Sequence, residues 1–294
     1  MMKKFVFIFC LLLLSKLNGQ HMPVYSGYFF NPVTLNPADA GFRKALDASL
    51  THRRQWVSFN GAPVTTTFVA HTALANEKIN VGLSCTSDRY GVTSVLDVKA
   101  LFAYRVFLQP KKHLSFGIAA GINQYSNRWS EITPSVSGDP VFIAGDDRRG
   151  CATLSAGVMY RSPRLAIGFS IPELIRTNQG TQHFQYLLSA EYKWKASQEL
   201  TLIPVAAVRH LVTASPQLEF ACTAQLHEQF SLGLGYRSHD AITLLSKVRI
   251  NQQLEVGYSY DATVSKLRGT TGGSHEIMIR YLFLYPAETR RPRI

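Results

Sequence analysis

The sequence predicts an all-β fold: a transmembrane antiparallel up-and-down β-barrel of about 14 strands, preceded by an irregular N-terminal lead-in. Three observations predict it. Apolar and polar residues alternate along most of the chain after residue 45, no stretch approaches the ~20 apolar residues of a membrane helix, and short and long connections follow one another. A soluble β-sandwich is the alternative, but its outward faces would be polar, whereas here they are repeatedly Phe, Tyr and Leu.

The first 19 residues have the pattern of a secretory signal peptide. Lys3 and Lys4 precede an apolar run from Phe5 to Leu14, and the small residue Gly19 stands just before Gln20. A basic start, a short apolar core and a small residue at the break are typical of a cleaved export signal. We expect residues 1–19 to be removed and the mature chain to start at Gln20.

Residues 20–44 form the lead-in. They contain the steps Asn31-Pro32 and Asn36-Pro37, followed by Gly41. Proline lacks a backbone N–H and pushes the residue before it toward extended geometry, so two such steps this close exclude one continuous helix or a regular strand. The segment is therefore predicted to be fixed, irregular backbone held against the β structure.

The barrel is predicted over residues 45–285. In residues 95–108 one face carries Leu96, Val98 and Phe102, while Asp97 and Lys99 lie on the other, which is the period of two that a strand requires. Such segments are close to the ~10 residues of a tilted spanning strand. The predicted strands are 45–54, 64–73, 79–87, 94–108, 113–125, 151–161, 164–171, 183–195, 199–210, 216–226, 229–237, 241–250, 253–261 and 275–285.

Short and long connections alternate along these strands, which is typical of a barrel with short periplasmic turns and longer extracellular loops. Both ends of the chain are then expected on the periplasmic side, with a basic tail at 286–294 that is either solvated or in contact with a periplasmic partner. The predicted inward face carries charges of both signs, which favours a wet or salt-bridged lumen over a single arginine ladder. These residues are Asp97, Lys99, Arg105, Glu191, Lys193, Glu219, Arg237, Lys247, Arg249, Glu255, Glu276 and Arg280.

Charge and cysteine content exclude several classes of function. The formal net charge is +12, but the basic residues are dispersed, which argues against nucleic acid and favours attraction to outer-membrane lipid and lipopolysaccharide or to an acidic protein. Cys85, Cys151 and Cys222 are widely separated and give neither a disulfide framework nor zinc spacing. No cofactor, metal site or catalytic residue is predicted.

A series of motifs runs along the mature chain: Asn31-Pro32, Asn36-Pro37 with Gly41, Arg53 with Gln55-Trp56, and Ser274-His275-Glu276. In this order they resemble the PorP/SprF family, outer-membrane proteins of the type IX secretion and gliding machinery of Bacteroidetes. The likeness covers essentially the whole mature chain and includes Asp139-Pro140. Its candidate partner-binding or structural residues are Tyr25, Asn31, Pro32, Asn36, Pro37, Gly41, Arg53, Gln55, Trp56, Pro63, Asp261, His275 and Glu276. One departure is Asp39, where the family pattern leads us to expect an aromatic residue.

The resemblance implies a barrel in the outer membrane without catalytic activity. It also implies the partners: the periplasmic ring and motor proteins of the type IX system, and cargo C-terminal domains or surface adhesins. The expected role is that of an adaptor, anchor or translocation component for such cargo. A general porin or channel, or an outer-membrane lipid hydrolase, are the alternatives.

Three other groups of polar residues have plainer explanations. Ser238-His239-Asp240 contains the residue types of a hydrolase, but neighbours on extended backbone point to alternating sides and relay protons badly. Asp146 and its charged neighbours form either a calcium site or, as we expect, a solvated loop. His275 and Glu276 are expected to form a hydrogen-bonded pair at the rim.

The sequence also predicts where the lead-in lies. Because residues 25–41 precede the first spanning strand, we expect this segment to start in the periplasm and fold back into the barrel. Asn31, Pro32, Asn36, Pro37 and Arg53 should then pack within the lumen or at its mouth, as a plug or docking element.

Overall fold

The computed structural model describes residues 25–43, 45–74, 77–132, 145–176, 184–212 and 215–284. The predicted signal peptide, the basic tail 286–294 and the Asp139-Pro140 step lie outside the described residues. Within them, no helix is long and apolar enough to cross a membrane.

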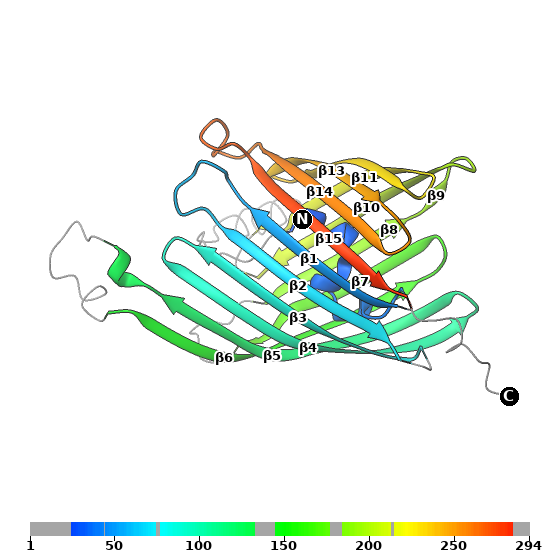
Figure 1. The fold of residues 1–294 in the computed structure, drawn as a ribbon, viewed down its shortest axis with the longest axis horizontal. Helices are drawn as coiled ribbons and strands as arrows, with labels where there is room; N and C mark the ends of the chain where they lie inside the picture. Colours follow the sequence, from blue (N-terminus) through cyan, green and yellow to red (C-terminus); the bar gives the residue numbers. More distant parts are fainter. Residues whose placement is uncertain are drawn as a thin grey trace, which may run out of the picture.

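The described chain forms one closed antiparallel barrel (Figure 1). Strands β1 to β15 follow one another around the wall, and the ring closes through the pairing of β1 with β15. The strands are β1 Leu46–Arg54, β2 Val64–Ala73, β3 Ile79–Tyr90, β4 Thr93–Gln109, β5 Lys112–Asn127, β6 Asp147–Arg161, β7 Leu165–Arg176, β8 Gln185–Tyr192, β9 Trp194–Lys195, β10 Leu200–Leu211, β11 Gln217–Leu226, β12 Phe230–Arg237, β13 Ala241–Arg249, β14 Leu254–Thr263 and β15 Ser274–Phe283.

Fifteen labelled strands make 14 spanning strands, because β8 and β9 both pair with β10 and are one strand interrupted at Lys193. The ladder breaks between the pairs Glu191–Val205 and Trp194–Leu202, a stretch of β10 that contains Pro204, and proline cannot donate a hydrogen bond to the ladder. The predicted fold class, with an irregular lead-in before the first strand, is confirmed. Each predicted strand overlaps one spanning strand of the structure.

The two faces of the wall separate as the alternation predicts. On β4, Leu96 and Phe102 are more than two-fifths exposed, while Leu101 and Arg105 are at most one-twentieth exposed. The exposed apolar side chains continue around the outer wall, where a lipid bilayer would cover them. Small and polar residues therefore face the lumen.

The connections gather at two rims. The short turns include residues 110–111 and 162–164, and this edge is called the short-turn rim below; the opposite edge is the long-loop rim. The predicted alternation of length is not strict, because β3 and β4 extend to a two-residue turn at Gly91-Val92. There Gly91 has a φ of 53°, a left-handed conformation that glycine adopts without strain.

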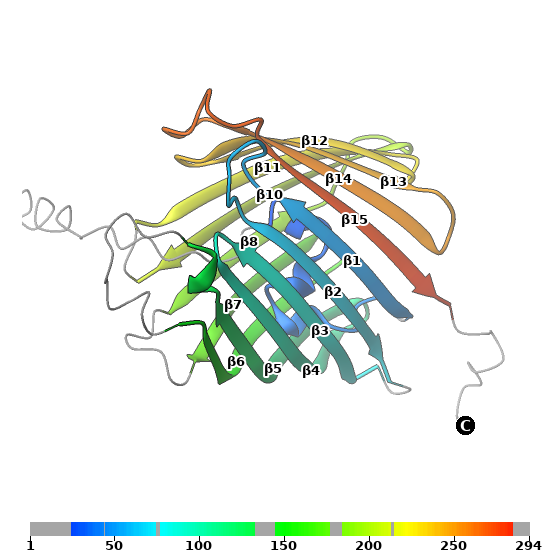
Figure 2. The ribbon, with the colours of Figure 1, turned by 60° about the vertical axis from the view of Figure 1, so that its left-hand side comes forward.

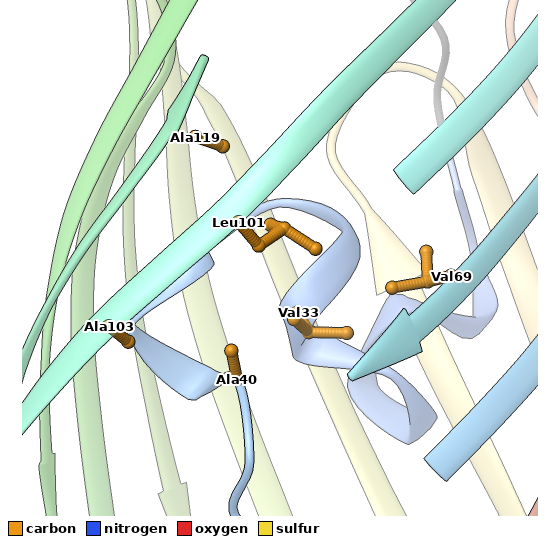
Figure 3. Close-up of a cluster of buried hydrophobic side chains, with 6 residues drawn as sticks. All are labelled: Val33, Ala40, Val69, Leu101, Ala103 and Ala119. Carbon is orange, nitrogen blue, oxygen red and sulfur yellow. The ribbon is translucent and has the colours of Figure 1, made fainter. Parts of the chain in front are cut away.

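The lead-in lies inside the barrel (Figures 1 and 2). It consists of three short 3₁₀ helices, η1 Gly27–Phe30, η2 Pro32–Thr34 and η3 Pro37–Asp39; a fourth, η4 Trp129–Glu131, follows β5. Figure 3 shows Val33 and Ala40 of the lead-in packed with inward residues of the wall in one buried apolar cluster. The remaining members of that cluster are Val69, Leu101, Ala103 and Ala119.

The start of the described lead-in lies deeper in the barrel than expected. The Tyr25 hydroxyl shares a hydrogen bond with the hydroxyl of Thr67, the fourth residue of β2 counted from its long-loop end. The chain then descends through the lumen and enters β1 at the short-turn rim. The expectation that residues 25–41 start in the periplasm was therefore wrong for Tyr25, because buried polar partners on the wall hold this residue in the lumen. The expected position of the mature chain start lies outside the described residues, and β15 ends at the short-turn rim, as expected.

Candidate functional site

The Asn-Pro steps shape the lead-in. Asn31 and Asn36 are both extended in φ, at −142° and −132°, and each is followed by a proline that opens a 3₁₀ helix. The Asn36 side chain also caps its own helix by accepting a hydrogen bond from the backbone N–H of Ala38 at 3.0 Å. The two Asn-Pro steps thus start η2 and η3 as separate tight turns, so the lead-in does not continue as one helix.

A buried polar cluster holds the start of the lead-in. We call it the Ser26 cluster: Ser26, Arg53, Arg237, Asp261 and Glu276. The Ser26 hydroxyl donates to the Asp261 carboxylate at 2.5 Å and accepts from the guanidinium groups of Arg53 and Arg237, each at 2.9 Å. Glu276 accepts from the backbone N–H groups of Ser26 and Gly27, both at 2.9 Å.

Ion pairs tie the same cluster to four strands. Arg53 of β1 pairs with Asp261 of β14 at 2.7 Å and with Glu276 of β15 at 3.3 Å. Arg237 of β12 reaches Asp261 at 3.4 Å. All of these side chains are at most 3% exposed, so removing one partner would leave an uncompensated buried charge, which typically costs about 3–5 kcal/mol.

A second polar cluster holds the middle of the lead-in from the short-turn side. Arg280 of β15 donates to the Phe30 carbonyl at 2.7 Å and to the Asn31 side chain at 2.9 Å. Its guanidinium also pairs with Asp47 and Glu255, each at 3.1 Å. Arg280 therefore binds both the backbone and the Asn31 side chain of the lead-in, while Asp47 and Glu255 of the wall balance its charge.

Asp39 holds the end of the lead-in. Its carboxylate accepts a hydrogen bond from the Arg161 guanidinium of β6 at 2.8 Å, and the Arg161 guanidinium lies 4.2 Å from the ring centre of Phe42. Asp39, which stands where an aromatic residue was expected, thus has a charged partner in this chain. The ion pair between Asp39 and Arg161 attaches η3 to the wall.

Glycines in the wall let η3 approach closely. A Cβ at Gly117 of β5 would lie 2.2 Å from the backbone nitrogen of Ala38, and one at Gly157 of β6 would lie 2.1 Å from the Asn36 side chain. Asn36 uses this proximity to donate to the Val158 carbonyl at 3.1 Å. Gly117 and Gly157, which we call the glycine patch, are therefore part of the binding surface for the lead-in.

Tyrosines of the lead-in are buried in the lumen. Burial raises the pKa of Tyr25 to about 12 and also raises that of Tyr28 well above its usual value. The Tyr25 hydroxyl lies 2.8 Å from the Thr67 hydroxyl, and the Tyr28 ring packs in an apolar cluster with Leu187 and Ala207. Burial thus disfavours the charged phenolate form of both residues.

The structure brings most of the motif residues together in the lumen. Tyr25, Asn31, Asn36 and Pro37 lie in the buried lead-in, and Gly41, with a φ of 70°, donates its N–H to His71 at 3.0 Å. Pro32 is half-buried. Arg53, Asp261 and Glu276 join them through the Ser26 cluster.

Three motif residues, Gln55, Trp56 and Pro63, lie at the long-loop rim. Gln55 donates its backbone N–H to the Pro63 carbonyl at 2.9 Å, which closes the base of the first long loop. Trp56, with a φ of 40°, donates its N–H to the Ser274 hydroxyl at 3.1 Å. These residues shape a loop at the long-loop rim and do not contact the Ser26 cluster through any hydrogen bond or ion pair found in the described chain.

His275 and Glu276 do not form the expected pair. Glu276 points into the lumen, while His275 lies on the outer face, 2.7 Å from the Tyr258 hydroxyl and beside the Tyr260 ring. Successive residues of a strand face opposite sides, so the prediction of a rim pair was wrong.

The Ser238-His239-Asp240 turn is not arranged as a catalytic triad. The Ser238 hydroxyl accepts from the backbone N–H of Leu218 at 2.9 Å, and the Asp240 carboxylate accepts from Arg237 at 2.9 Å. Within the described ranges no group of three or more His, Cys, Asp or Glu side chains could hold a metal ion. The polar groups of the candidate site instead bind the lead-in.

Two cavities flank the lead-in. One, of about 100 Å³, is lined by Val33 and Leu35 together with Asp88, Asp97 and Glu173 of the long-loop half. The other, of about 480 Å³, is lined by Phe30 and Pro32 and by residues near the short-turn rim. The lead-in therefore lies across the lumen between a cavity rich in acidic residues and one rich in basic residues.

Five residues of the site have no local sequence pattern that predicts a role in it: Ser26, Asp39, Arg161, Arg237 and Arg280. Arg237 and Arg280 were predicted to face inward, which the structure bears out, but their partners could not be named. Nothing in the local sequence around Gly117 and Gly157 predicts that they contact the lead-in. For the charged residues, the alternation along each strand predicts which side chains face the lumen. It does not predict which partner each side chain meets there.

A family model described as Type IX secretion system membrane protein PorP/SprF matches residues 17–281. Among curated proteins, none matches significantly. Two solved structures are similar in fold: the Ralstonia pickettii toluene transporter TbuX, and the CymD monoaromatic hydrocarbon channel. TbuX has 10% identity and a TM-score of 0.51, with 92% of this chain and 96% of that one covered. CymD has 10% identity and a TM-score of 0.52, with 91% and 95% covered. At these identities the likeness shows the fold alone.

Proposed function

The chain belongs to the PorP/SprF family of type IX secretion system membrane proteins, and we propose that it is a non-enzymatic adaptor or anchor in the outer membrane for secreted cargo. The cargo in this proposal carries a type IX C-terminal domain. The periplasmic ring and motor proteins of the same system are the proposed partners on the other side. The barrel itself supplies the outer-membrane location.

One observation carries the proposal: the lead-in occupies the lumen and is bound there by buried ion pairs. A passive channel needs a water-filled path through the lumen. The lead-in, held at the Ser26 cluster, at Arg280 and at Arg161, obstructs such a path. A rigid plug instead gives the barrel a fixed internal surface and fixed rims. Such surfaces suit the binding of proteins better than the passage of solutes.

Deletion of the gene, followed by comparison of the cell-surface and culture-fluid proteomes, tests the proposal. Loss of the barrel should change the location of at least one protein with a type IX C-terminal domain, and re-expression of the wild-type chain should restore it. An affinity-tagged barrel should also recover ring components or a large cargo protein. If no such protein changes location, the adaptor proposal is wrong.

A small-solute channel is the second candidate, favoured by the fold likeness to a toluene transporter and a hydrocarbon channel. It predicts size-dependent conductance or solute flux in liposomes that contain the purified barrel. The adaptor proposal predicts that the wild-type protein conducts little. An outer-membrane lipid hydrolase would require lipase activity that is lost on Ser238→Ala or His239→Ala.

A further inference from the structure

We propose that the 480 Å³ cavity at the short-turn rim is a binding site for an acidic peptide segment from the periplasm. We call this cavity the basic vestibule; its open cationic side chains are Arg164, Lys195 and Lys247. It lies between the lead-in and the short-turn rim, inside the strand wall. Its volume falls in the range of about 300–1,000 Å³ that is usual for ligand sites.

The lining of the vestibule carries a surplus of positive charge. Eight Lys and Arg side chains line it, against four Asp and Glu side chains. Glu255, which is not part of this lining, offsets one more positive charge, since it pairs with Arg43 at 3.0 Å and with Arg280 at 3.1 Å. A surplus of three positive charges remains after Glu255 is included.

Three of the cations carry this surplus. In the part of the chain that the structure describes, the side chains of Arg164, Lys195 and Lys247 make no hydrogen bond or ion pair. Arg164 and Lys195 are exposed at the rim, whereas Lys247 is half-buried, with its ammonium 5.2 Å from the ring centre of Phe30. Lys247 thus places a positive charge deep in the vestibule, next to the lead-in.

Apolar side chains lie among the cations. Phe29, Phe30 and Phe42 from the lead-in side and Ile203 and Val205 from β10 line the same cavity. A ligand that fits must combine negative charge with apolar surface. Acidic residues interspersed with aromatic or aliphatic ones have this chemistry.

The position of the vestibule favours a peptide over a lipid or a single small anion. The closed strand wall separates the cavity from the bilayer, so a lipid head group could not enter while its acyl chains stay in the membrane. The open cations come from three separate places along the chain: the turn after β6, β9 and β13. An extended acidic segment can contact several of them at once, which one phosphate cannot.

The inference rests on the proposed function, because it names the chemistry of a periplasmic or cargo segment that the adaptor would hold. Binding is tested by isothermal titration calorimetry of the full-length barrel in detergent micelles. The probe is an unlabelled hexapeptide that alternates Phe with Asp or Glu. The same peptide with Asn and Gln in place of the acids, and inorganic phosphate, are titrated alongside.

The acidic peptide should bind saturably, more weakly at higher salt, and at least tenfold more tightly than the neutral peptide. Arg164→Gln/Lys195→Gln/Lys247→Gln should weaken binding at least tenfold. Arg164→Gln/Lys195→Gln, which removes two of the three charges, should also weaken binding. Its matched control, Lys266→Gln/Arg268→Gln in the loop at the opposite rim, should change binding less than twofold.

Absence of saturable binding, equal loss in the control, or phosphate that binds as tightly as the peptide would overturn the inference. These results would leave the cargo phenotype of the deletion strain untouched, so failure here is distinguishable from failure of the adaptor proposal. Conversely, peptide binding without a cargo phenotype would support the vestibule and reject the adaptor role.

Discussion

Arg53 shows how one residue position connects the wall with the lead-in. It is the eighth residue of β1, where the alternation points its side chain inward, and there it meets Ser26, Asp261 and Glu276. Its neighbour Arg54 has the same chemistry but points outward and is exposed. The two arginines therefore separate the effect of charge from the effect of position.

Arg53→Gln should lower the free energy of unfolding by about 3–5 kcal/mol, because Asp261 and Glu276 keep their buried charges without this partner. Urea unfolding in liposomes, followed by tryptophan fluorescence, measures the change. Limited proteolysis should also cut the lead-in faster in this variant.

The control for this substitution is Arg54→Gln, which removes the same charge from the outer face. It should change stability by less than about 1 kcal/mol, as is usual for an exposed charge. Equal effects of the two substitutions would show that the Ser26 cluster does not hold the lead-in.

The shape of the lead-in fits the surface of the strands that it packs against. Each Asn-Pro step turns the chain, and the glycine patch gives η3 room against β5 and β6. The fit is close, since a single added carbon at Gly117 would overlap backbone atoms of Pro37 and Ala38. Because backbone atoms cannot rotate away as the end of a flexible side chain can, either the helix or the wall must shift.

Gly117→Ala should destabilise the barrel by about 1–3 kcal/mol, the usual cost of overpacking, and should expose the lead-in to protease. Gly150→Ala is the matched control, because a Cβ there meets nothing within 4 Å. The same unfolding and proteolysis measurements apply to both variants. A lead-in that stays equally protected in the two would contradict close packing at Gly117.

At the scale of the whole molecule, a closed wall surrounds a segment of its own chain. The wall closes through β1 with β15 and β10 with β11, so its ladders do not depend on the lead-in. The lead-in in turn separates the two luminal cavities. Wall and plug are therefore separable by deletion.

Deletion of residues 25–41 should leave a folded barrel whose ionic conductance in planar bilayers is clearly higher than that of the wild type. Heat-modifiable migration on SDS gels checks that the shortened barrel is folded. Wild-type conductance as high as that of the deletion variant would mean that the lead-in does not obstruct the lumen.

The sequence by itself determined the architecture of the barrel and the irregular character of the lead-in. A strand between lipid and lumen must alternate, so every spanning strand left a local pattern of period two, and Leu96 with Phe102 against Asp97 with Lys99 was enough to assign both faces. Proline chemistry made the Asn31-Pro32 and Asn36-Pro37 steps irregular for equally local reasons. The same alternation also implies that His275 and Glu276, as neighbours on one strand, point to opposite faces.

Only the tertiary structure decided what those faces meet. Ser26 reaches Glu276 across 250 positions of sequence, and Asp39 reaches Arg161 across 122. These contacts exist because closure of the barrel brings distant strands around one segment, and no local period encodes which inward charge faces which. The same closure decided that Tyr25 lies toward the long-loop rim and that the open cations gather in the basic vestibule.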